Sequence, residues 1–407
     1  MTVAPEDARI SWLRVLLIAT AAALPFVALS QVLAYPSVLL TIWILMRDPK
    51  RLSLCPRWHW VFALVFVLFC IGSVAWGVEG ARSLSRLHRL SLLLLMPAVA
   101  FAFAGRAPLP LVGGLVLGSV LSAAYDMVRV PLEVSAAKAL LDSGSLTTEE
   151  FNKVLLNTGS MTTPQFYLVG LLLLLAIPPR LWSSMVKRAP WAWGLALVIS
   201  GFGLIIHFKR GTWLAFALAV VLLSLLRQNR RILSALLLGV ALILAIPATR
   251  DRVKDMATML NPNKGDRAAL WSRVAPPLLR EHPWGYGYKA MRPRDLQAYH
   301  PVQPKLNHLH NNVLQIAGEL GWIGGAFWTV WMLAAWGASL AAVRRAAGDA
   351  RALAAGVCAA FTGLLANGMV EYNFGDTEIL MLFALLLGMI ARSSAPPGPV
   401  DVAGKGT

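Results

Sequence analysis

Long apolar runs recur along the whole chain, and they constrain its fold more than any other feature. Hydrophobic residues make up 57% of the 407 residues, charged residues only 14%, and the mean hydropathy is +0.63. A helix of about 20 apolar residues crosses the hydrocarbon core of a membrane, and most of the runs approach that length. Within such a span helices satisfy every backbone polar group. The sequence therefore predicts an all-α, polytopic integral membrane protein.

We expect about twelve membrane-spanning helices. The predicted ranges are 11–30, 32–46, 59–78, 87–105, 109–127, 164–179, 190–207, 212–226, 231–248, 313–343, 352–371 and 376–393. Residues 1–395 are expected to form one transmembrane domain, with a large, partly helical loop at 249–312 between the ninth and tenth helices. The first span is expected to stay as an anchor, and 396–407 to form a disordered cytoplasmic tail.

Basic residues in the short connections predict the orientation of these helices. The side that holds both termini carries 18 Lys and Arg against 5 acids, whereas the other side carries 19 against 15. Cytoplasmic loops are enriched in Lys and Arg. Both termini are therefore expected inside, and the loops 128–163 and 249–312 outside.

The outer loop 249–312 is itself strongly basic. Five acids face eleven cations, which are Arg250, Arg252, Lys254, Lys264, Arg267, Arg273, Arg280, Lys289, Arg292, Arg294 and Lys305. Long loops cross a membrane whatever their charge, so a passive connection is one reading. The other is an anion site. Lys209 and Arg210 favour it, because their short outer turn contains no acid and a phosphate would supply the partner.

Parts of the outer loops have local order. Asp266 is expected to begin a helix that carries Arg267 and Trp271 one turn apart and ends at Pro276–Pro277. The following stretch, His282 to Tyr288, is too rich in glycine for regular helix. It fits either a contact with a sugar or lipid head group, or an aromatic anchor at the membrane interface. In the loop 128–163, a Thr-x-x-Glu pattern predicts a capping box and a short amphipathic helix.

The strongest candidates for chemistry precede the tenth helix. A histidine such as His310 exchanges protons near neutral pH, although Asn311 beside it would also serve as a plain helix cap. His308 and His310 in an extended segment would also suit a metal, but no third ligand at suitable spacing is evident, and we expect no metal. Gly321 and Gly324 permit close packing of the helix that follows.

Several of these motifs occur in a set order along the chain. They are Arg210-Gly211 at the start of a span, Arg267 and Trp271 followed by Pro283-x-Gly285-x-Gly287, and His310-Asn311 followed by Gly321-x-x-Gly324. Together they resemble the O-antigen ligase family and its polymerase relatives, which are bacterial inner-membrane glycosyltransferases that use undecaprenyl-diphosphate donors. The motifs occupy about 207–325, and the twelve-span layout extends the resemblance over most of the chain.

The resemblance implies a ligase that joins a glycan to a sugar hydroxyl of lipid A-core in one inverting step, the last step of lipopolysaccharide assembly. Arg210 and Arg267 would stabilise the diphosphate, and His310 would accept the proton of the hydroxyl or orient it. The expected substrate contacts are Lys209, Asn311, His308, Trp271, Tyr286 and Lys289. No cofactor is expected. The expected partners are the lipid-linked donor, the lipid A-core acceptor and membrane lipids, and no nucleic acid is expected. The chain is expected to be a monomer in a Gram-negative inner membrane. Its active site is expected on the periplasmic side.

Motifs that are missing from the sequence narrow the possible classes of enzyme. No Asp-x-Asp or phosphate-binding glycine-rich loop is present, which disfavours a transferase using metal and nucleotide sugar. Cys55, Cys70 and Cys358 form no disulfide or metal-thiolate pattern. A repeat-unit polymerase and a protein O-oligosaccharyltransferase share the motif set, and a transporter of an anionic or lipid-linked substrate is the non-enzyme alternative. The predicted span interiors contain almost no acids, which disfavours the transporter. The spacing from His310-Asn311 to Gly321 and the modest length favour the ligase.

Overall fold

All regular structure is helical wherever the structure describes the chain. This computed structural model describes residues 8–157, 161–182, 190–245, 250, 267–299 and 308–394. These residues contain no strand, so the predicted all-α class is confirmed. The helix start expected at Asp266 and the tail 396–407 lie outside the described residues, as do four of the loop cations, Arg252, Lys254, Lys264 and Lys305.

Helices occupy each of the twelve predicted ranges. Along the first half of the chain they are α1 (Ala8–Ala23), α2 (Val27–Arg47), α3 (Arg57–Trp76), α4 (Gly80–Leu84), the 3-10 helix η2 (Leu87–Leu94), α5 (Leu95–Ala102), α6 (Leu109–Asp142), α7 (Thr148–Asn157) and α8 (Thr163–Ala176). Then follow α10 (Pro190–Ile206), α11 (Arg210–Arg227), α12 (Arg230–Ala245), α15 (Arg267–Ala269), the π-helix η5 (Leu270–Val274), α16 (Ala275–Glu281), α17 (Pro293–Gln297), α18 (Asn312–Arg345), α19 (Gly348–Gly368) and α20 (Thr377–Ser394).

Seven helices in the described part of the chain are long and apolar enough to cross a membrane. They are α2, α3, the segment Gly80–Ala102, α6, α11, α18 and α19. The 14-residue helix α8 is apolar but shorter, and at 1.5 Å per residue it covers only about 21 Å of a core about 30 Å thick. A multi-pass membrane protein is supported, whereas the predicted count of twelve crossings is not confirmed.

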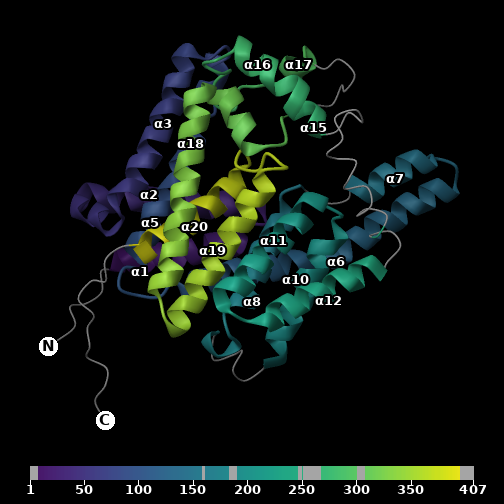
Figure 1. Cartoon of the computed structure of the whole chain (residues 1–407), viewed down its shortest axis with the longest axis horizontal. Helices are drawn as coiled ribbons and strands as arrows, with labels where there is room; N and C mark the ends of the chain where they lie inside the picture. The colour runs from purple at the N-terminus through teal and green to yellow at the C-terminus, as the bar shows by residue number, and fades with distance from the viewer. Residues whose placement is uncertain are drawn as a thin grey trace.

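The helix α20 lies deepest in the bundle. Its residues from Ile379 to Ala391 are all buried, and it packs against α5, α18 and α19 (Figure 1). The apolar surface all around this helix suits an enclosed position. The turn that leads into α20 is thereby held beside the first residues of α18.

Buried amides tie that turn to three helices. The side-chain NH2 of Asn312, the first residue of α18, donates to the side-chain oxygen of Asn373 at 2.7 Å. Asn373 in turn donates to Gln165 of α8 at 2.8 Å and to Asn367 of α19 at 3.3 Å. A buried polar network with every member bonded favours one arrangement of its helices. The turn between α19 and α20 therefore has a fixed place at the start of α18.

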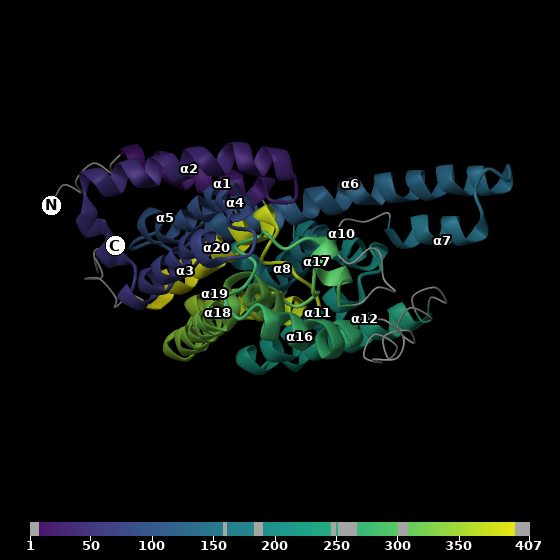
Figure 2. The same cartoon turned by 90° about the horizontal axis from the view of Figure 1, so that it is seen from above.

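The predicted outer loop at 128–163 is largely helix. α6 continues to Asp142 and is 34 residues long, because residues 128–142 contain several alanines and leucines and no glycine until Gly144, whose φ is 74°. α6 and α7 extend together away from the rest of the molecule (Figure 2). The capping box is confirmed, since the Thr147 hydroxyl accepts the N–H of Glu150 at 3.2 Å and the Glu150 carboxylate accepts the N–H of Thr147 at 2.9 Å.

Residues 267–281 form one continuous helical stretch. The prediction that Pro276–Pro277 ends this helix is wrong, because both prolines lie in the first turn of α16. There a missing N–H leaves no helical hydrogen bond unmade. The stretch begins with Arg267 and passes through the π-helix η5, which contains Trp271.

A sharp kink divides α18 at Gly321, whose φ of 79° and ψ of 175° are not helical. The irregular loop predicted at 282–288 packs there. The N–H groups of Tyr286 and Gly287 donate to the carbonyl oxygens of Gly318 at 2.9 Å and Glu319 at 2.8 Å. These loop N–H groups thus bind carbonyl oxygens of the helix next to the kink, and they fix the loop against the first third of α18.

Replacing Gly321 with alanine is expected to destabilise the protein by about 1–3 kcal/mol, because the positive φ is strained for any side chain. An added Cβ would also collide with the carbonyl oxygen of Pro283. Thermal unfolding in detergent measures the effect. Gly337→Ala is the matched control, since a Cβ at this position of the same helix meets no described atom within 4 Å. Equal melting temperatures for the two variants would show that the kink is dispensable.

Candidate functional site

The carboxylate of Glu371, in the turn between α19 and α20, joins residues predicted to act in catalysis. Its Oε2 accepts a hydrogen bond from Nη2 of Arg267 at 2.7 Å. Its Oε1 lies 2.7 Å from Nδ1 of His310 and 3.7 Å from Nε2 of His308. Glu371 is only 7% exposed. Two predicted catalytic residues from distant parts of the chain therefore meet at one buried acid.

The sequence does not single out Glu371 as a site residue. The available signal is weak: Glu371, Asp376 and Glu378 lie in and after the short turn before the last helix, and the chain has a basic loop elsewhere. That pattern is compatible with ion pairing but does not say which acid meets which cation.

Opposing effects set the charge of Glu371. Burial alone would raise its pKa, but the hydrogen bond with His310 and the positive charges of His310 and Arg267 lower the pKa of Glu371 to about 2. An ionised carboxylate only accepts hydrogen bonds, so Nδ1 of His310 has to donate. In a neutral His310 the lone pair therefore lies on Nε2, which is then able to accept a proton.

The backbone holds His310 in a special position. Its φ is 49°, in the left-handed region that side chains rarely adopt, and such strain of about 1–3 kcal/mol persists where the surroundings fix it. Asn311, the next residue, caps α18 by accepting the N–H of Leu314 at 3.0 Å and donates to the carbonyl oxygen of Met369 at 2.9 Å. The side chain of Asn311 thus positions the histidine segment against the end of α19.

Arg210 begins α11. The next residue, Gly211, lies close to Arg267, because a Cβ added there would be 3.5 Å from Nη1 of that arginine. Thr212 fixes this corner by accepting a hydrogen bond from Asn367 of α19 at 3.1 Å. The preceding Phe208 has a φ of 52°, which turns the chain sharply before Lys209. The turn with Lys209 and Arg210 therefore ends against the same arginine that binds Glu371.

A second buried polar cluster holds the other end of that turn. Asp126 of α6 accepts hydrogen bonds from Nε2 of His207 at 2.8 Å, from Arg129 at 2.9 Å and from the hydroxyl of Tyr167. His207 and Asp126 are both buried. Asp126 is an exception to the expected scarcity of acids inside spans, and it anchors α10 just before Lys209.

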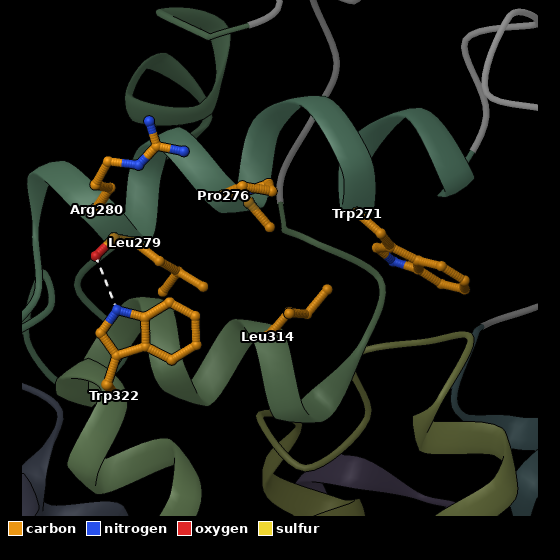
Figure 3. Close-up of a pocket in the computed structure, with 7 residues that line it drawn as sticks. Trp271, Pro276, Leu279, Arg280, Leu314 and Trp322 are labelled. Atoms are coloured by element: carbon orange, nitrogen blue, oxygen red, sulfur yellow. Dashed lines mark hydrogen bonds between the residues drawn. The ribbon is translucent and has the colours of Figure 1, made fainter.

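Trp271 connects the site to an apolar pocket. Its Nε1 donates to the carbonyl oxygen of Leu309 at 2.9 Å, directly before His310. The pocket between α16 and α18 has a volume of about 270 Å³ and is lined by Trp271, Ala275, Pro276, Leu279, Arg280, Leu314 and Trp322. Figure 3 shows the indole of Trp322 bonded to the carbonyl oxygen of Leu279, a distance of 3.2 Å. Mostly apolar side chains thus cover the surface next to the polar site.

Lys289 and Tyr286 have different surroundings. Lys289, with a φ of 51°, donates its Nζ to the carbonyl oxygen of Gly375 in the turn that carries Glu371. Tyr286 is 5% exposed and belongs to the apolar cluster around α16 and the start of α18, where its ring packs on His282. The structure therefore brings Lys289 to the site and places the Tyr286 ring in a core.

A third potential metal ligand, which the sequence spacing does not reveal, lies beside the two histidines, because one ligand atom from each of His308, His310 and Glu371 lies within 4.8 Å of the others. Burial, with the charge of His310, lowers the pKa of His308 to about 4, so its ring is neutral at pH 7 and able to ligate. Arg267, however, already binds the same carboxylate at 2.7 Å, and its charge opposes a cation there. The arrangement has metal-ligand geometry in an electrostatic setting that suits an anion better.

Comparison with protein families agrees with the resemblance seen in the sequence. A family model described as O-antigen ligase matches residues 195–329. The match runs from α10 to the kinked part of α18 and contains Arg210, Arg267 and His310, whereas Glu371 lies beyond it. A search of curated proteins finds no match for the chain.

Proposed function

We propose that this chain, whose residues 195–329 carry the domain of the O-antigen ligase family, transfers a polysaccharide from undecaprenyl diphosphate to a sugar hydroxyl of lipid A-core. The observation that carries the proposal is the Glu371 carboxylate, which binds Arg267 and His310 at once. Transfer from a lipid diphosphate needs a cation for the leaving group and an acceptor for the hydroxyl proton. Both lie in this one cluster. In a Gram-negative cell the reaction would take place on the periplasmic side of the inner membrane.

The proton would leave through His310. The hydroxyl of the acceptor sugar would give its proton to Nε2 of His310, while its oxygen attacks the anomeric carbon of the donor. Glu371, which accepts the hydrogen bond of Nδ1, would stabilise the imidazolium as it forms. Attack from the face opposite the diphosphate inverts the anomeric carbon, in agreement with the single inverting step that the resemblance implies.

The diphosphate would leave towards Arg267 and Arg210. A guanidinium has five N–H donors, and the Nη2 of Arg267 is the nitrogen bonded to Glu371. As the bond between the anomeric carbon and the phosphate oxygen breaks, the electron pair stays on the diphosphate, whose growing charge the remaining donors would stabilise. Gly211 keeps the start of α11 against this guanidinium, so that Arg210 would act on the same group.

The apolar pocket would take part of the hydrocarbon chain of the donor. It shares Trp271 with the site, and its other lining side chains are mostly apolar, as a carrier lipid requires. A diphosphate at Arg267 would place the first isoprene units within reach of this surface.

Replacing Trp322 with alanine is expected to raise the KM for an undecaprenyl-linked donor several-fold, because about 1 kcal/mol of apolar contact would be lost. The KM for a donor with a short geranyl chain should change less. Ile323→Ala is the matched control, because Ile323 is the next residue, is also exposed, and does not line the pocket. Equal effects on both donors would remove the pocket from the proposal.

The decisive experiment supplies the purified protein with an undecaprenyl-diphosphate glycan and one acceptor at a time. Transfer to lipid A-core is the expected result. Transfer to a second carrier-linked glycan would indicate a repeat-unit polymerase instead, and transfer to a pilin-like protein an O-oligosaccharyltransferase. Movement of the intact donor across a vesicle membrane without any transfer would indicate a transporter.

A further inference from the structure

The segment 77–90 begins directly after α3 and contains α4 and the first half of η2. It lies against the loop that carries Lys289. The N–H groups of Val78 and Glu79 donate to the carbonyl oxygens of Gly285 at 3.4 Å and of Tyr286 at 2.8 Å. This segment lies outside residues 195–329, and no motif of the sequence points to it. It nevertheless forms a wall beside the proposed active site.

Close backbone contacts fix this wall. Gly287 has a φ of 109°, and a Cβ added to it would lie 3.0 Å from the Cβ of Ser83. Glu79 forms ion pairs with Arg292 and, at 3.1 Å, with Arg294. The position of the 77–90 segment relative to Lys289 is therefore set by hydrogen bonds, packing and charge together.

Three cations gather where the wall meets the loop. Arg86 and Arg89 are half-buried, and Lys289 is bonded to the carbonyl oxygen of Gly375. Burial lowers the pKa of Lys289, the charges of Arg89 and Arg86 lower it further, and the charges of Glu319 and Asp376 act in the opposite direction. The carbonyl oxygen of Ser83, which lies against Gly287, accepts the N–H of Arg86 at 2.9 Å, and the carbonyl oxygen of Arg86 accepts the N–H of Arg89 at 3.2 Å, so both arginines follow closely on the contact with the Lys289 loop. Among the residues that the structure describes, no carboxylate forms an ion pair with Arg86 or Arg89.

The nearby acids leave a positive surplus. Glu319 is buried and accepts hydrogen bonds from Gln315, from Tyr372 and from the N–H of Lys289. Glu371 is engaged by Arg267 and His310, as described above. Asp376 and Glu378 remain, and burial together with the charge of Glu378 raises the pKa of Asp376 to about 7, so these two acids together carry less than two negative charges at neutral pH. A half-buried cationic group in which neither arginine has a carboxylate partner favours an anionic ligand.

The group also belongs to the active site. Nζ of Lys289 lies 6.0 Å from the centre of the Tyr372 ring, the ring of His308 lies 5.7 Å from the same ring, and the rings of His308 and His310 are 4.1 Å apart. A ligand held by Lys289 would therefore lie close to the proposed base. Arg267 and Arg210 are assigned to the donor diphosphate, so this second group of cations is available to the other substrate.

We propose that Arg86, Arg89 and Lys289 bind a phosphate monoester on the acceptor saccharide and so bring its hydroxyl to His310. This inference rests on the proposed transferase function and names the chemical class of its acceptor. A phosphate monoester carries about −1.5 to −2 at pH 7, which balances the surplus better than a carboxylate does. Arginine suits it because the guanidinium fork matches two phosphate oxygens. Fixing both substrates at separate anion sites supplies the alignment that a reaction of two lipid-anchored molecules needs.

The test compares variants of the full chain in phosphatidylcholine vesicles that contain the undecaprenyl-diphosphate donor. Each variant is given one of two acceptors. The first is phosphorylated core lipid, and the second is the same lipid after removal of its phosphates with hydrogen fluoride. The double variant Arg86→Gln and Arg89→Gln is expected to raise the KM for the phosphorylated acceptor about tenfold or more, with the KM for the donor unchanged. The matched control is Arg82→Gln, since Arg82 is an exposed arginine of the same segment whose charge acts on Asp295. The control should stay within about twofold of the wild type, because a lone surface charge contributes little.

The wild type alone provides a second measurement, which does not depend on the folding of a variant. Added NaCl should raise its KM for the phosphorylated acceptor and leave the KM for the dephosphorylated acceptor unchanged. Equal KM values for the two acceptors, or a double variant that alters only donor use, would overturn the inference. The comparison is repeated in vesicles that also contain phosphatidylglycerol, and an effect of the double variant that appears only there would assign the site to a membrane head group, which also overturns the inference. Absence of any transfer by the wild type, or full transfer by His310→Ala, would instead overturn the proposed function itself.

Discussion

The variant His310→Ala is expected to transfer glycan about 10² to 10⁴ times more slowly than the wild type, because it removes the proposed proton acceptor. The loss should appear in kcat with both substrates saturating, since the donor diphosphate is assigned to Arg210 and Arg267. A time course with purified protein, lipid-linked glycan and core lipid measures it.

His308→Ala is the control for this variant. Both rings lie beside Glu371, but His308 is 3.7 Å from the carboxylate and His310 is 2.7 Å from it. The His308 variant should therefore keep most of the activity. If the two variants were equally slow, the histidines would act as a pair and the assignment of a single base would fail. Full activity in His310→Ala would remove the base altogether.

The variant Glu371→Gln is expected to lose about 10² to 10⁴-fold in turnover. A neutral amide still reaches Nδ1 of His310 but no longer stabilises an imidazolium, and a comparable change beside a catalytic histidine has an effect of this order. Asp376→Asn, compared above about pH 8 where this acid is mostly ionised, is the matched control, because it removes an acid from the same turn that binds neither His310 nor Arg267. Measuring kcat for both variants separates the role of Glu371 from a general loss of negative charge.

The acid stability of the same variant gives an independent check. The pKa of Glu371 is lowered from 4.5 to about 2 by its hydrogen bond and charge partners, against the effect of burial. Its ion pairs therefore stabilise the fold fully above pH 4.5, and this contribution is lost as the pH falls towards 2. The melting temperature of the wild type should drop more steeply over this range than that of Glu371→Gln. Parallel curves would show that Glu371 is not paired in solution.

Much of the fold follows from local sequence patterns. Apolar runs of helical length predict the positions of the long apolar helices, and Thr147 with Glu150 predicts a cap that the structure contains. The predictions fail where the effect of one residue depends on its neighbours in the chain. Residues 128–142 are polar enough for a loop but rich in helix formers up to Gly144, and Pro276–Pro277 fall in a first turn, where proline is tolerated.

The candidate site was only partly predictable. His310, Arg267 and Arg210 belong to motifs with a recognisable spacing, and the structure brings Arg267, His310 and the corner after Arg210 together. Glu371 and the arginines at 86 and 89 belong to no such motif. Their importance depends on the packing of α3, α18 and α20 into one bundle, which places residues more than 60 positions apart in contact. No periodicity or spacing in a single sequence encodes that meeting.

Because Glu371 binds Arg267 on one side and His310 on the other, the segment between those two residues is pinned at both of its ends. Exposed positions of this segment, such as Ser272 and Glu281, can therefore change without moving the guanidinium or the imidazole, whereas Trp271 and Lys289 are tied to the site itself. Related chains would be free to vary the exposed positions while the proposed proton acceptor and phosphate-binding arginine stay in register.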